Sequence, residues 1–242
     1  MAKVKTTIIH EDEDIIIVNK PSGVLTIPDR FVLDRPNLVK DLKRSREELF
    51  VVHRLDRETS GAICFAKNKM AHKHISKQFQ ERTVDKYYLA LVEGTPYQED
   101  GTIDKPIAES TVTRGKMIIH ERGKASLTLY KVIESFKHYA LVSANIKTGR
   151  THQVRIHFSS IGHPLASDSL YGRKDKIFLS EIKGKKYSKG KYVEEQPLID
   201  RTTLHAFQLS FDHPTSGERL FFEAEPPKDL RALLNQLRKW GK

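Results

Sequence analysis

A run of polar residues, HRLDRETSG at 53–61, lies between two apolar segments. Those segments have the composition of strands, so we expect 53–61 to form a loop at the edge of a sheet. Asp56 stands between Arg54 and Arg57, and neighbouring cations favour the ionised form of a carboxyl group. An ionised aspartate in a cleft can act as a nucleophile or a base. The simpler alternative is a solvated charged loop in which Asp56 caps a turn.

A second polar run, KTGRTHQVRIH at 147–157, marks an expected turn from a strand into a helix. Free backbone N–H groups at a helix N-terminus bind phosphate, and Arg150 is close to them in the sequence. His152 and Arg155 are three residues apart and should share a face of that helix. The simpler alternative is an ordinary strand-to-helix turn with an exposed polar face.

Adjacent aromatic residues, Tyr87 and Tyr88, follow Lys86 in a third segment that has the pattern of a strand. Neighbouring side chains of a strand point to opposite faces, so one tyrosine should be in the core while the other can face a cleft. An aromatic ring in a basic cleft is a stacking platform for a nucleobase. The alternative is that both rings only pack within the fold.

The sequence offers little support for metal or cofactor chemistry. The chain has 11 histidines, but His72 with His74, and His152 with His157, lack acidic or cysteine partners at ligand spacing. His-Glu-x-x-His, Walker, GxGxxG and Gly-x-Ser-x-Gly motifs are absent from the sequence. The single cysteine, Cys64, excludes an intramolecular disulfide and cannot form a thiolate zinc site alone. We therefore expect no metal site and no cofactor.

The elements that must position these residues are mostly short strands. Apolar periodicity, caps and turn residues predict strands at 6–10, 15–19, 50–53, 62–66, 87–92, 117–120, 126–132, 139–146, 204–211 and 220–224. The same signals predict helices at 37–46, 68–81, 151–161 and 228–240, with Asn37 and Asn68 as N-caps of the first two. The helices are inserted without βαβ regularity, which indicates an α+β fold with a mixed or antiparallel sheet.

Composition narrows the class of partner. The chain has 242 residues, a net charge of +11 and a sequence pI near 9.6. This charge favours a polyanionic partner, with nucleic acid first and an anionic membrane second. No apolar run reaches the roughly 18 residues of a membrane span, and Met1 to Lys5 lack a signal-peptide core. We expect a cytoplasmic protein that does not enter a membrane.

We expect a single domain over residues 1–242, because no linker is long enough to separate two domains. One composition shift occurs, at 173–191, where 19 residues carry eight Lys or Arg and two Asp or Glu. Gly184 and Gly190 lie in the same segment. These features predict a flexible basic insertion.

Taken together, the motifs resemble the RluA family of pseudouridine synthases over nearly the whole chain. The matching segments are IIIVNKPSGV at 15–24, HRLDRETSG at 53–61 with FAK at 65–67, KYYLA at 86–90, TGRTHQVRIH at 148–157, Asp168 with Tyr171 and Gly172, and LHAFQLSF at 204–211 before His213 and Pro214. Several such motifs in the family's order and spacing make a chance match implausible.

The resemblance implies the pseudouridine synthase fold, a mainly antiparallel mixed sheet with flanking helices and a central cleft. It also implies isomerisation of uridine to pseudouridine in structured RNA, in which uracil is detached at N1, rotated and rejoined through C5. Asp56 matches the family's catalytic carboxylate, and it could attack the sugar, attack the base or remove a ribose proton. Tyr88 matches the tyrosine that stacks on the target base, and Arg155 matches the arginine expected to hold Asp56 ionised and aimed.

The resemblance also implies how RNA is held. The target uridine must leave its stack, and Arg54 matches the position that fills the vacated space. Further expected RNA-binding residues are Arg57, Arg150, His152, Lys183, Lys185, Lys186 and Lys189. The partner is then a stem-loop of transfer or ribosomal RNA, bound by a monomer that needs no protein partner and no cofactor.

This sequence departs from the family pattern in two ways: Ser167 replaces the usual glycine before Asp168, and the S4-type RNA-binding domain found in many relatives is not expected here. Two other functions stay open. One is an RNA-binding module without activity, which the presence of Asp56, Tyr88 and Arg155 argues against. The other is a metal-dependent phosphoesterase using the polar residues His53, Asp56, His152 and His157.

Overall fold

The computed structural model describes residues 6–29, 32, 34–188 and 194–242. The chain forms two compact units: unit 1 comprises Met1–Tyr88 and His205–Pro226, and unit 2 comprises Leu89–Leu204 and Pro227–Lys242. Each unit is therefore assembled from two separate stretches of sequence, and each is described on its own.

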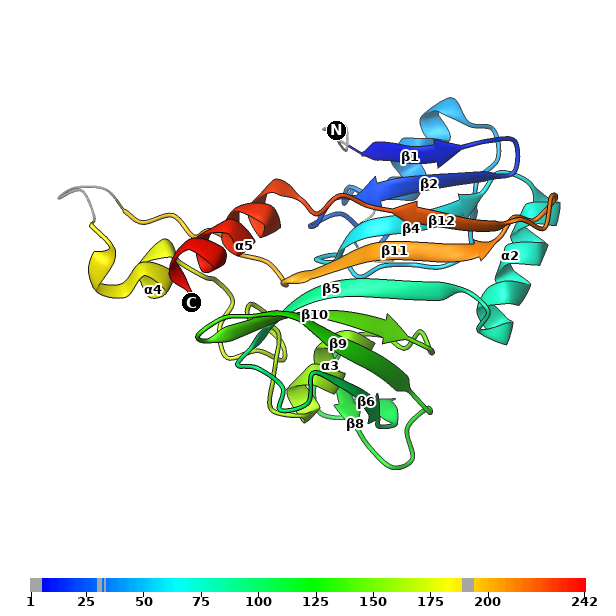
Figure 1. The fold of residues 1–242 in the computed structure, drawn as a ribbon. Coiled ribbons are helices and arrows are strands. Elements are labelled where there is room, and N and C mark those ends of the chain that lie inside the picture. Colours follow the sequence, from blue (N-terminus) through cyan, green and yellow to red (C-terminus); the bar gives the residue numbers. More distant parts are fainter. Residues whose placement is uncertain (1–5, 30–31, 33, 189–193) are drawn as a thin grey trace. The chain divides into compact units, whose positions relative to one another are not determined.

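Unit 1 is a sheet with helices on its faces (Figure 1). Its elements are β1 (Thr7–Glu11), β2 (Ile15–Lys20), α1 (Leu38–Leu42), η1 (Lys43–Ser45), β3 (Phe50–Val51), β4 (Ser60–Ala66), α2 (Lys69–Glu81), β11 (Leu204–Asp212) and β12 (Arg219–Glu223). The strand order is β1–β2–β4–β11–β12, and β3 also pairs with β4. β4 and β11 run parallel, whereas the other pairs are antiparallel.

Alternation along β2 and β4 divides the apolar side chains of unit 1 between two clusters. Ile15 and Ile17 pack in the cluster that holds Ala71 and Ile75 of α2. Ile16, by contrast, belongs to the cluster of α1, which also takes in Leu55 and Tyr88. Because both faces are covered, β2 and β4 are buried along almost their whole lengths.

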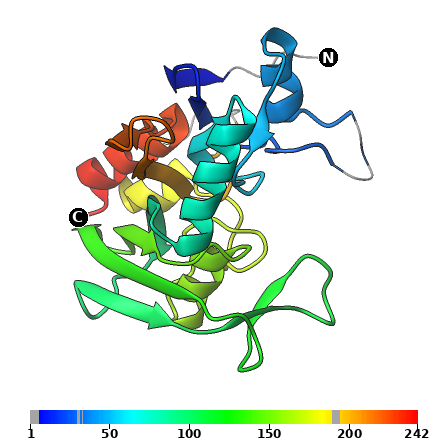
Figure 2. The same cartoon turned by 90° about the vertical axis from the view of Figure 1, so that its right-hand side faces the viewer.

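Unit 2 contains a second set of strands, in which β9 runs antiparallel to both β10 and β6. Its elements are β5 (Asp85–Glu93, whose first residues belong to unit 1), β6 (Asp100–Asp104), β7 (Ile107–Glu109), β8 (Met117–Ile119), β9 (Leu127–Ser135), β10 (Tyr139–Ile146), α3 (Gln153–Ser160), α4 (Leu179–Lys183), η2 (Gly184–Lys186) and α5 (Lys228–Trp240). The order is β5–β10–β9–β6, and β7 pairs with β8 in a separate hairpin. This hairpin stands out from the other strands of the unit (Figure 2).

Helix α5 closes the core of unit 2 with one face. Leu230, Leu233, Leu234 and Leu237 are buried against a cluster that includes Phe136, Leu141 and Ile177. Their spacing of three and four residues places them on one stripe of the helix. The amphipathic pattern at 228–240 therefore predicted this helix correctly.

Most of the predicted elements are confirmed. Asn37 and Asn68 cap α1 and α2 by accepting the N–H groups of Lys40 and Ala71. The mixed, mainly antiparallel sheet with flanking helices confirms the α+β class. The single domain over 1–242 and the central cleft stay predictions.

Two predictions need correction. The helix expected from residue 151 begins at Gln153, because His152 has a left-handed backbone conformation with a φ of 57°. The insertion at 173–191 is also more ordered than expected, since it forms α4 and η2 and its Ile177 is fully buried. Its described residues are thus attached to the core of unit 2.

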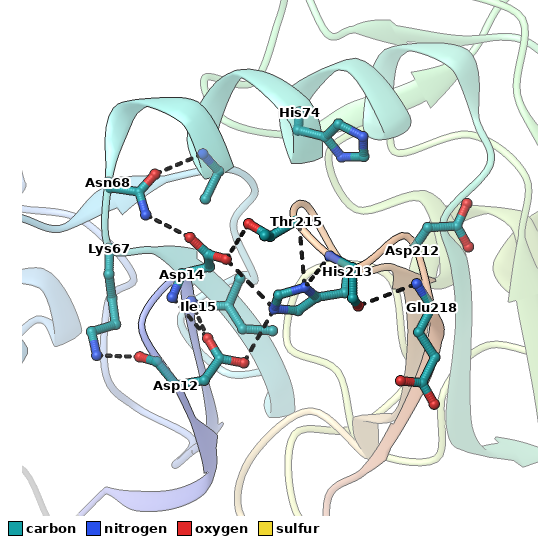
Figure 3. Close-up of polar contacts among 12 residues, drawn as sticks. Asp12, Asp14, Ile15, Lys67, Asn68, His74, Asp212, His213, Thr215 and Glu218 are labelled. Carbon is teal, nitrogen blue, oxygen red and sulfur yellow. Dashed lines mark hydrogen bonds and ion pairs between the residues drawn. The ribbon is translucent and has the colours of Figure 1, made fainter.

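Carboxylates and a histidine tie together two turns of unit 1 (Figure 3). Asp12 accepts the N–H groups of Asp14 and Ile15, each at 2.8 Å, and closes the β1–β2 turn. His213 in the β11–β12 turn places its Nε2 atom 3.3 Å from Asp12. His213 Nδ1 accepts the backbone N–H of Ser216 at 3.1 Å, so the ring proton lies on Nε2, toward the carboxylate. His213 therefore has a structural role.

No helix in the described part of the chain is both long enough and apolar enough to span a membrane. Among the same residues, no three His, Cys, Asp or Glu side chains are grouped so that they could share a metal ion.

Candidate active site

The loop that carries Asp56 is fixed where it enters β4. Gly61 has a φ of 122°, and a Cβ atom there would lie 2.1 Å from the carbonyl oxygen of Ala206. Only glycine allows this close approach between β4 and β11. Ser60 Oγ is hydrogen bonded to His205 Nδ1 at 2.9 Å, while His205 Nε2 donates to the carbonyl of Ala224. The end of the HRLDRETSG motif is thus a packing requirement of the sheet.

Residues 20–26, with the sequence KPSGVLT, form hydrogen bonds with the backbone of the same loop at residues 55–58. We call this set of contacts the clasp. Gly23 N–H donates to the carbonyl of Arg57 at 2.9 Å, and Ser22 Oγ donates to that of Glu58 at 2.7 Å. Thr26 Oγ1 donates to the Leu55 carbonyl and accepts the Leu55 N–H. Residues 20–26, which overlap the family motif at 15–24, therefore hold the loop by bonds to its backbone atoms.

Lys20 is the centre of this clasp, and its role was not predicted. Its side chain is fully buried, and Nζ donates to the carbonyls of Pro21, Val24 and Arg57 at 3.0, 2.6 and 2.9 Å. A buried ammonium group is tolerated only when its hydrogen-bonding capacity is met. No local pattern around NKPSG indicates that this lysine is buried, because the Arg57 carbonyl that it binds lies 37 residues along the chain.

Asp56 and Tyr88 come together in unit 1. Both side chains are half-buried. The pKa of Tyr88 is raised far above its usual range, first because burial disfavours the phenolate and then because the Asp56 carboxylate is near. The phenol is therefore neutral at physiological pH, and it can stack on a base or donate a hydrogen bond. Of the two tyrosines considered from sequence, Tyr88 is the one beside the candidate carboxylate.

The arginines flanking Asp56 differ in their contacts. Arg57 is exposed and pairs with Glu58 at 2.7 Å. Arg54 is also exposed and makes no hydrogen bond or ion pair with another described residue. Arg54 can therefore meet a ligand without first giving up a contact within the described chain.

In unit 2 the guanidinium of Arg155 has a buried partner that the sequence analysis did not assign. Its Nε and Nη2 atoms donate to the two carboxylate oxygens of Asp168, each at 2.7 Å. Burial raises the pKa of Asp168, but hydrogen bonds from Arg155, Leu170 N–H and Tyr171 N–H outweigh it and hold the pKa below its usual range. This bidentate pair fixes the orientation of Arg155.

Tyr171 gathers two of the predicted residues. The Arg155 guanidinium lies over its ring, 5.0 Å from the centroid, and His152 Nδ1 is hydrogen bonded to its hydroxyl at 2.8 Å. His152, at the N-cap of α3, and Arg155, within the helix, therefore both contact Tyr171. Ser167, the departure from the family pattern, is accommodated because its hydroxyl donates to the Asp175 carbonyl at 2.6 Å.

Arg150 lies at the start of α3, where Gln153 occupies part of the expected phosphate site. The Gln153 side chain accepts the Arg150 N–H at 3.0 Å and the Thr148 hydroxyl at 2.7 Å. Arg150 Nε donates to the Ala125 carbonyl at 3.3 Å. One backbone donor is thus already satisfied, and the anion-binding capacity of this turn rests mainly on the Arg150 side chain.

The histidines suggested for a phosphoesterase have structural partners. His53 stacks on Phe79, its Nε2 accepts the Cys64 N–H at 3.0 Å, and burial with nearby Lys86 lowers its pKa to about 3. Both ring nitrogens of His157 are hydrogen bonded, to Thr128 and to the Lys105 carbonyl. Neither ring offers a lone pair to a metal without losing these bonds.

The lysines of the insertion lie on α4 and η2. Lys183 ends α4, while Lys185 and Lys186 are exposed in η2. Lys189 lies outside the described residues.

Comparisons with known proteins give the family. A family model described as RNA pseudouridylate synthase matches residues 14–160, the part that contains Asp56, Tyr88 and Arg155. An uncharacterized RNA pseudouridine synthase of Aquifex aeolicus is 37% identical over 240 residues, covering 95% of this chain and 72% of the relative. Ribosomal large subunit pseudouridine synthase D of Zymomonas mobilis is 36% identical over 241 residues, covering 95% and 72%.

Solved structures agree with this assignment. Human RNA pseudouridylate synthase domain containing 4 superimposes with a TM-score of 0.73 and 26% identity, covering 96% of this chain and 93% of the human chain. Human RNA pseudouridylate synthase domain containing 1 gives a TM-score of 0.70 and 29% identity, covering 98% and 96%. The predicted resemblance is therefore confirmed, and the chain belongs to the RluA family of RNA pseudouridine synthases.

Proposed function

We propose that this protein isomerises uridine to pseudouridine in RNA, with Asp56 as the essential carboxylate. The N1–C1′ bond breaks and a C5–C1′ bond forms, while C5 loses a proton and N1 gains one. No water is consumed and nothing is oxidised, so one carboxylate can begin the reaction. The observation that carries the proposal is the half-buried Asp56 beside the neutral Tyr88 phenol, in a loop clasped through its backbone.

Tyr88 and Arg155 have different proposed roles in the reaction. The neutral Tyr88 ring stacks on the target uracil, and its hydroxyl assists proton transfer. Arg155, which matches the active-site arginine of the family, acts on the chemical step. Its rigid pairing with Asp168 supports this proposal, because a preorganised cation loses little entropy when the substrate binds.

We further propose that Arg54 fills the stack vacated by the flipped uridine. Its exposure and its lack of a partner among the described residues support this role. Arg57, Arg150, His152 and the insertion lysines contact RNA phosphates. No cofactor takes part in the proposed reaction.

The proposed substrate is large-subunit ribosomal RNA, at a uridine in a stem-loop. Relatives with 34–37% identity from several bacteria are named ribosomal large subunit pseudouridine synthase D. We propose that the protein works in the cytoplasm, as a monomer and without a protein partner. Mapping pseudouridines in ribosomal and transfer RNA of a deletion strain against the parent strain tests the choice of RNA.

Tritium release from RNA labelled at C5 of uridine tests the activity directly. Wild-type protein should release tritium in a single turnover, whereas Asp56→Asn should fall by at least about 10³-fold, the order of loss when an essential catalytic group is removed. Asp104→Asn is the matched control, because it makes the same charge change at an exposed carboxylate of β6. Retention of wild-type rates by Asp56→Asn would refute the assignment of Asp56.

The same assay separates the competing functions. An inactive RNA-binding module would bind the transcript without releasing tritium. A metal-dependent phosphoesterase would cleave RNA and lose activity in EDTA. We expect tritium release to survive EDTA when the RNA is shown to stay folded.

A further inference from the structure

Unit 2 contains a pocket of about 560 Å³ that none of the family motifs above forms. Its walls come from α4 with η2, from the C-terminal end of α5 and from the turn between β9 and β10. Six lysines line it: Lys137, Lys183, Lys185, Lys186, Lys239 and Lys242. We call it the basic pocket.

The side chains that line the basic pocket are mostly positively charged. Glu181 is the one acidic side chain in its lining, and that carboxylate already pairs with Lys174. None of the six lysines forms an ion pair with another described residue. Like charges held this close repel one another, and an anionic ligand would remove that repulsion.

Trp240 lies at the centre of these charges. The ammonium groups of Lys183, Lys186 and Lys239 lie 5.1, 5.5 and 5.2 Å from its ring centroid. Cations at this distance are attracted to the indole face. Three ammonium groups, from α4, η2 and α5, therefore surround a half-buried aromatic ring.

The walls of the basic pocket are anchored to the core. Ile182 of α4 packs against the cluster that holds Leu233 and Leu237 of α5. The Lys137 N–H donates to the Gly241 carbonyl at 2.6 Å and so joins the β9–β10 turn to the end of α5. The arrangement is built by tertiary contacts and is not a loose basic tail.

We propose that the basic pocket binds a nucleotide of the substrate RNA other than the uridine that reacts. The lysines hold the phosphates, and the Trp240 ring stacks on a base. Pockets of roughly 300–1,000 Å³ hold small ligands, so 560 Å³ suits a nucleotide. Lysine-lined grooves with an aromatic platform are a general solution for single-stranded RNA. The inference rests on the proposed function, since it takes RNA as the substrate.

Trp240 makes the test specific, because it is the only tryptophan of the chain. An oligouridylate about ten nucleotides long is titrated against the 242-residue chain while tryptophan fluorescence is followed. Stacking should change the emission of Trp240 with saturation. Inorganic polyphosphate of equal charge is the second probe, and it should compete for the lysines without producing the stacking signal.

The charge variant is Lys183→Gln with Lys186→Gln and Lys239→Gln. Its matched control is Lys69→Gln with Lys73→Gln and Lys131→Gln, three exposed lysines outside the basic pocket. Both triple variants lower the net charge from +11 to +8. Loss of three phosphate contacts should weaken RNA binding roughly tenfold to a hundredfold and reduce the salt slope by about 2–3. The control should change either quantity much less.

Single-turnover tritium release at saturating enzyme separates this inference from the proposed function. The inference holds if the pocket variant binds RNA more weakly than the control variant and if RNA changes the emission of Trp240 with saturation. It fails if the pocket variant and the control bind alike, or if RNA leaves Trp240 emission unchanged, while wild-type tritium release still supports the function. Absence of tritium release from wild-type protein would instead refute the proposed function.

Discussion

The loop that carries Asp56 and the helix that carries Arg155 are held by different kinds of bond. In the loop, Lys20, Gly23 and Thr26 bind the backbone of residues 55–57. On α3, the Arg155 side chain itself is held, by a bidentate pair with the buried carboxylate of Asp168.

This difference predicts that Asp168 contributes mainly to the stability of the fold, whereas Asp56 contributes mainly to the reaction. The clasp fixes where Asp56 lies through bonds to the backbone around it, and the Asp56 side chain is half-buried beside Tyr88. Asp168 is buried, and it accepts hydrogen bonds from Arg155, Leu170 and Tyr171. Two aspartates of one chain should therefore respond in opposite ways to the same substitution.

The largest effects are expected from exchanging each carboxylate for an amide. Asp168→Asn leaves a buried cation without its counterion, which costs about 3–5 kcal/mol of unfolding free energy. Asp56→Asn should change the unfolding free energy by less than about 1 kcal/mol, as for most positions away from a buried network. Urea unfolding of the two variants checks this. If both substitutions lowered the unfolding free energy equally, the proposed difference between Asp168 and Asp56 would be wrong.

The next effect concerns the two arginines of the TGRTHQVRIH segment. Arg155→Ala should lower the single-turnover rate at saturating enzyme by about 10²-fold, the scale for removing a group that stabilises charge in a reaction. Arg150→Ala should weaken RNA binding and leave that rate within a few fold, because among the described residues its side chain contacts only the Ala125 carbonyl. Equal losses of rate at saturation would contradict this division of roles.

The clasp can be broken without substituting Asp56 or either of the arginines that flank it. Lys20→Met leaves the carbonyls of Pro21, Val24 and Arg57 without this donor, and each such loss in a buried place costs about 1–3 kcal/mol. We expect lower stability together with a lower rate, since the loop around Asp56 loosens. Thr26→Val is the milder companion, because it removes only the bonds to Leu55. If Lys20→Met unfolds like wild type, the clasp does not hold the loop.

Acid should narrow the stability gap between wild type and Asp168→Asn. The pKa of Asp168 is lowered in the folded protein, so its contribution is complete above the ordinary carboxyl pKa and is lost as the pH falls through the folded value. The wild-type curve should fall more steeply, by up to about 1.4 kcal/mol per pH unit for one proton. Urea unfolding of both proteins between about pH 6 and pH 3 measures the gap. A constant gap over that range would contradict the assigned pKa shift.

The sequence alone determined the features that depend on neighbours along the chain. Asn37 and Asn68 cap helices because their side chains reach N–H groups three residues ahead. The α5 stripe and the β11–β12 hairpin follow from periodicity and a turn. Asp56 was found because local charges and a family motif coincide at 53–61.

Only the tertiary structure decided which side chains meet. Asp168 pairs with Arg155 from 13 residues away, Lys20 reaches a loop 37 residues on, and Trp240 gathers lysines from α4 and η2. No local pattern specifies such partners, because an ion pair or a ring contact depends on how distant elements pack. The basic insertion at 173–191 also depends on tertiary contacts. Its charges predicted a flexible loop, but Ile177 is buried in the core of unit 2, and α4 and η2 line the basic pocket. Ile177 packs against residues that are distant in the sequence, such as Leu91 and Leu233, and burying this apolar surface stabilises the segment in a way that its local composition does not indicate.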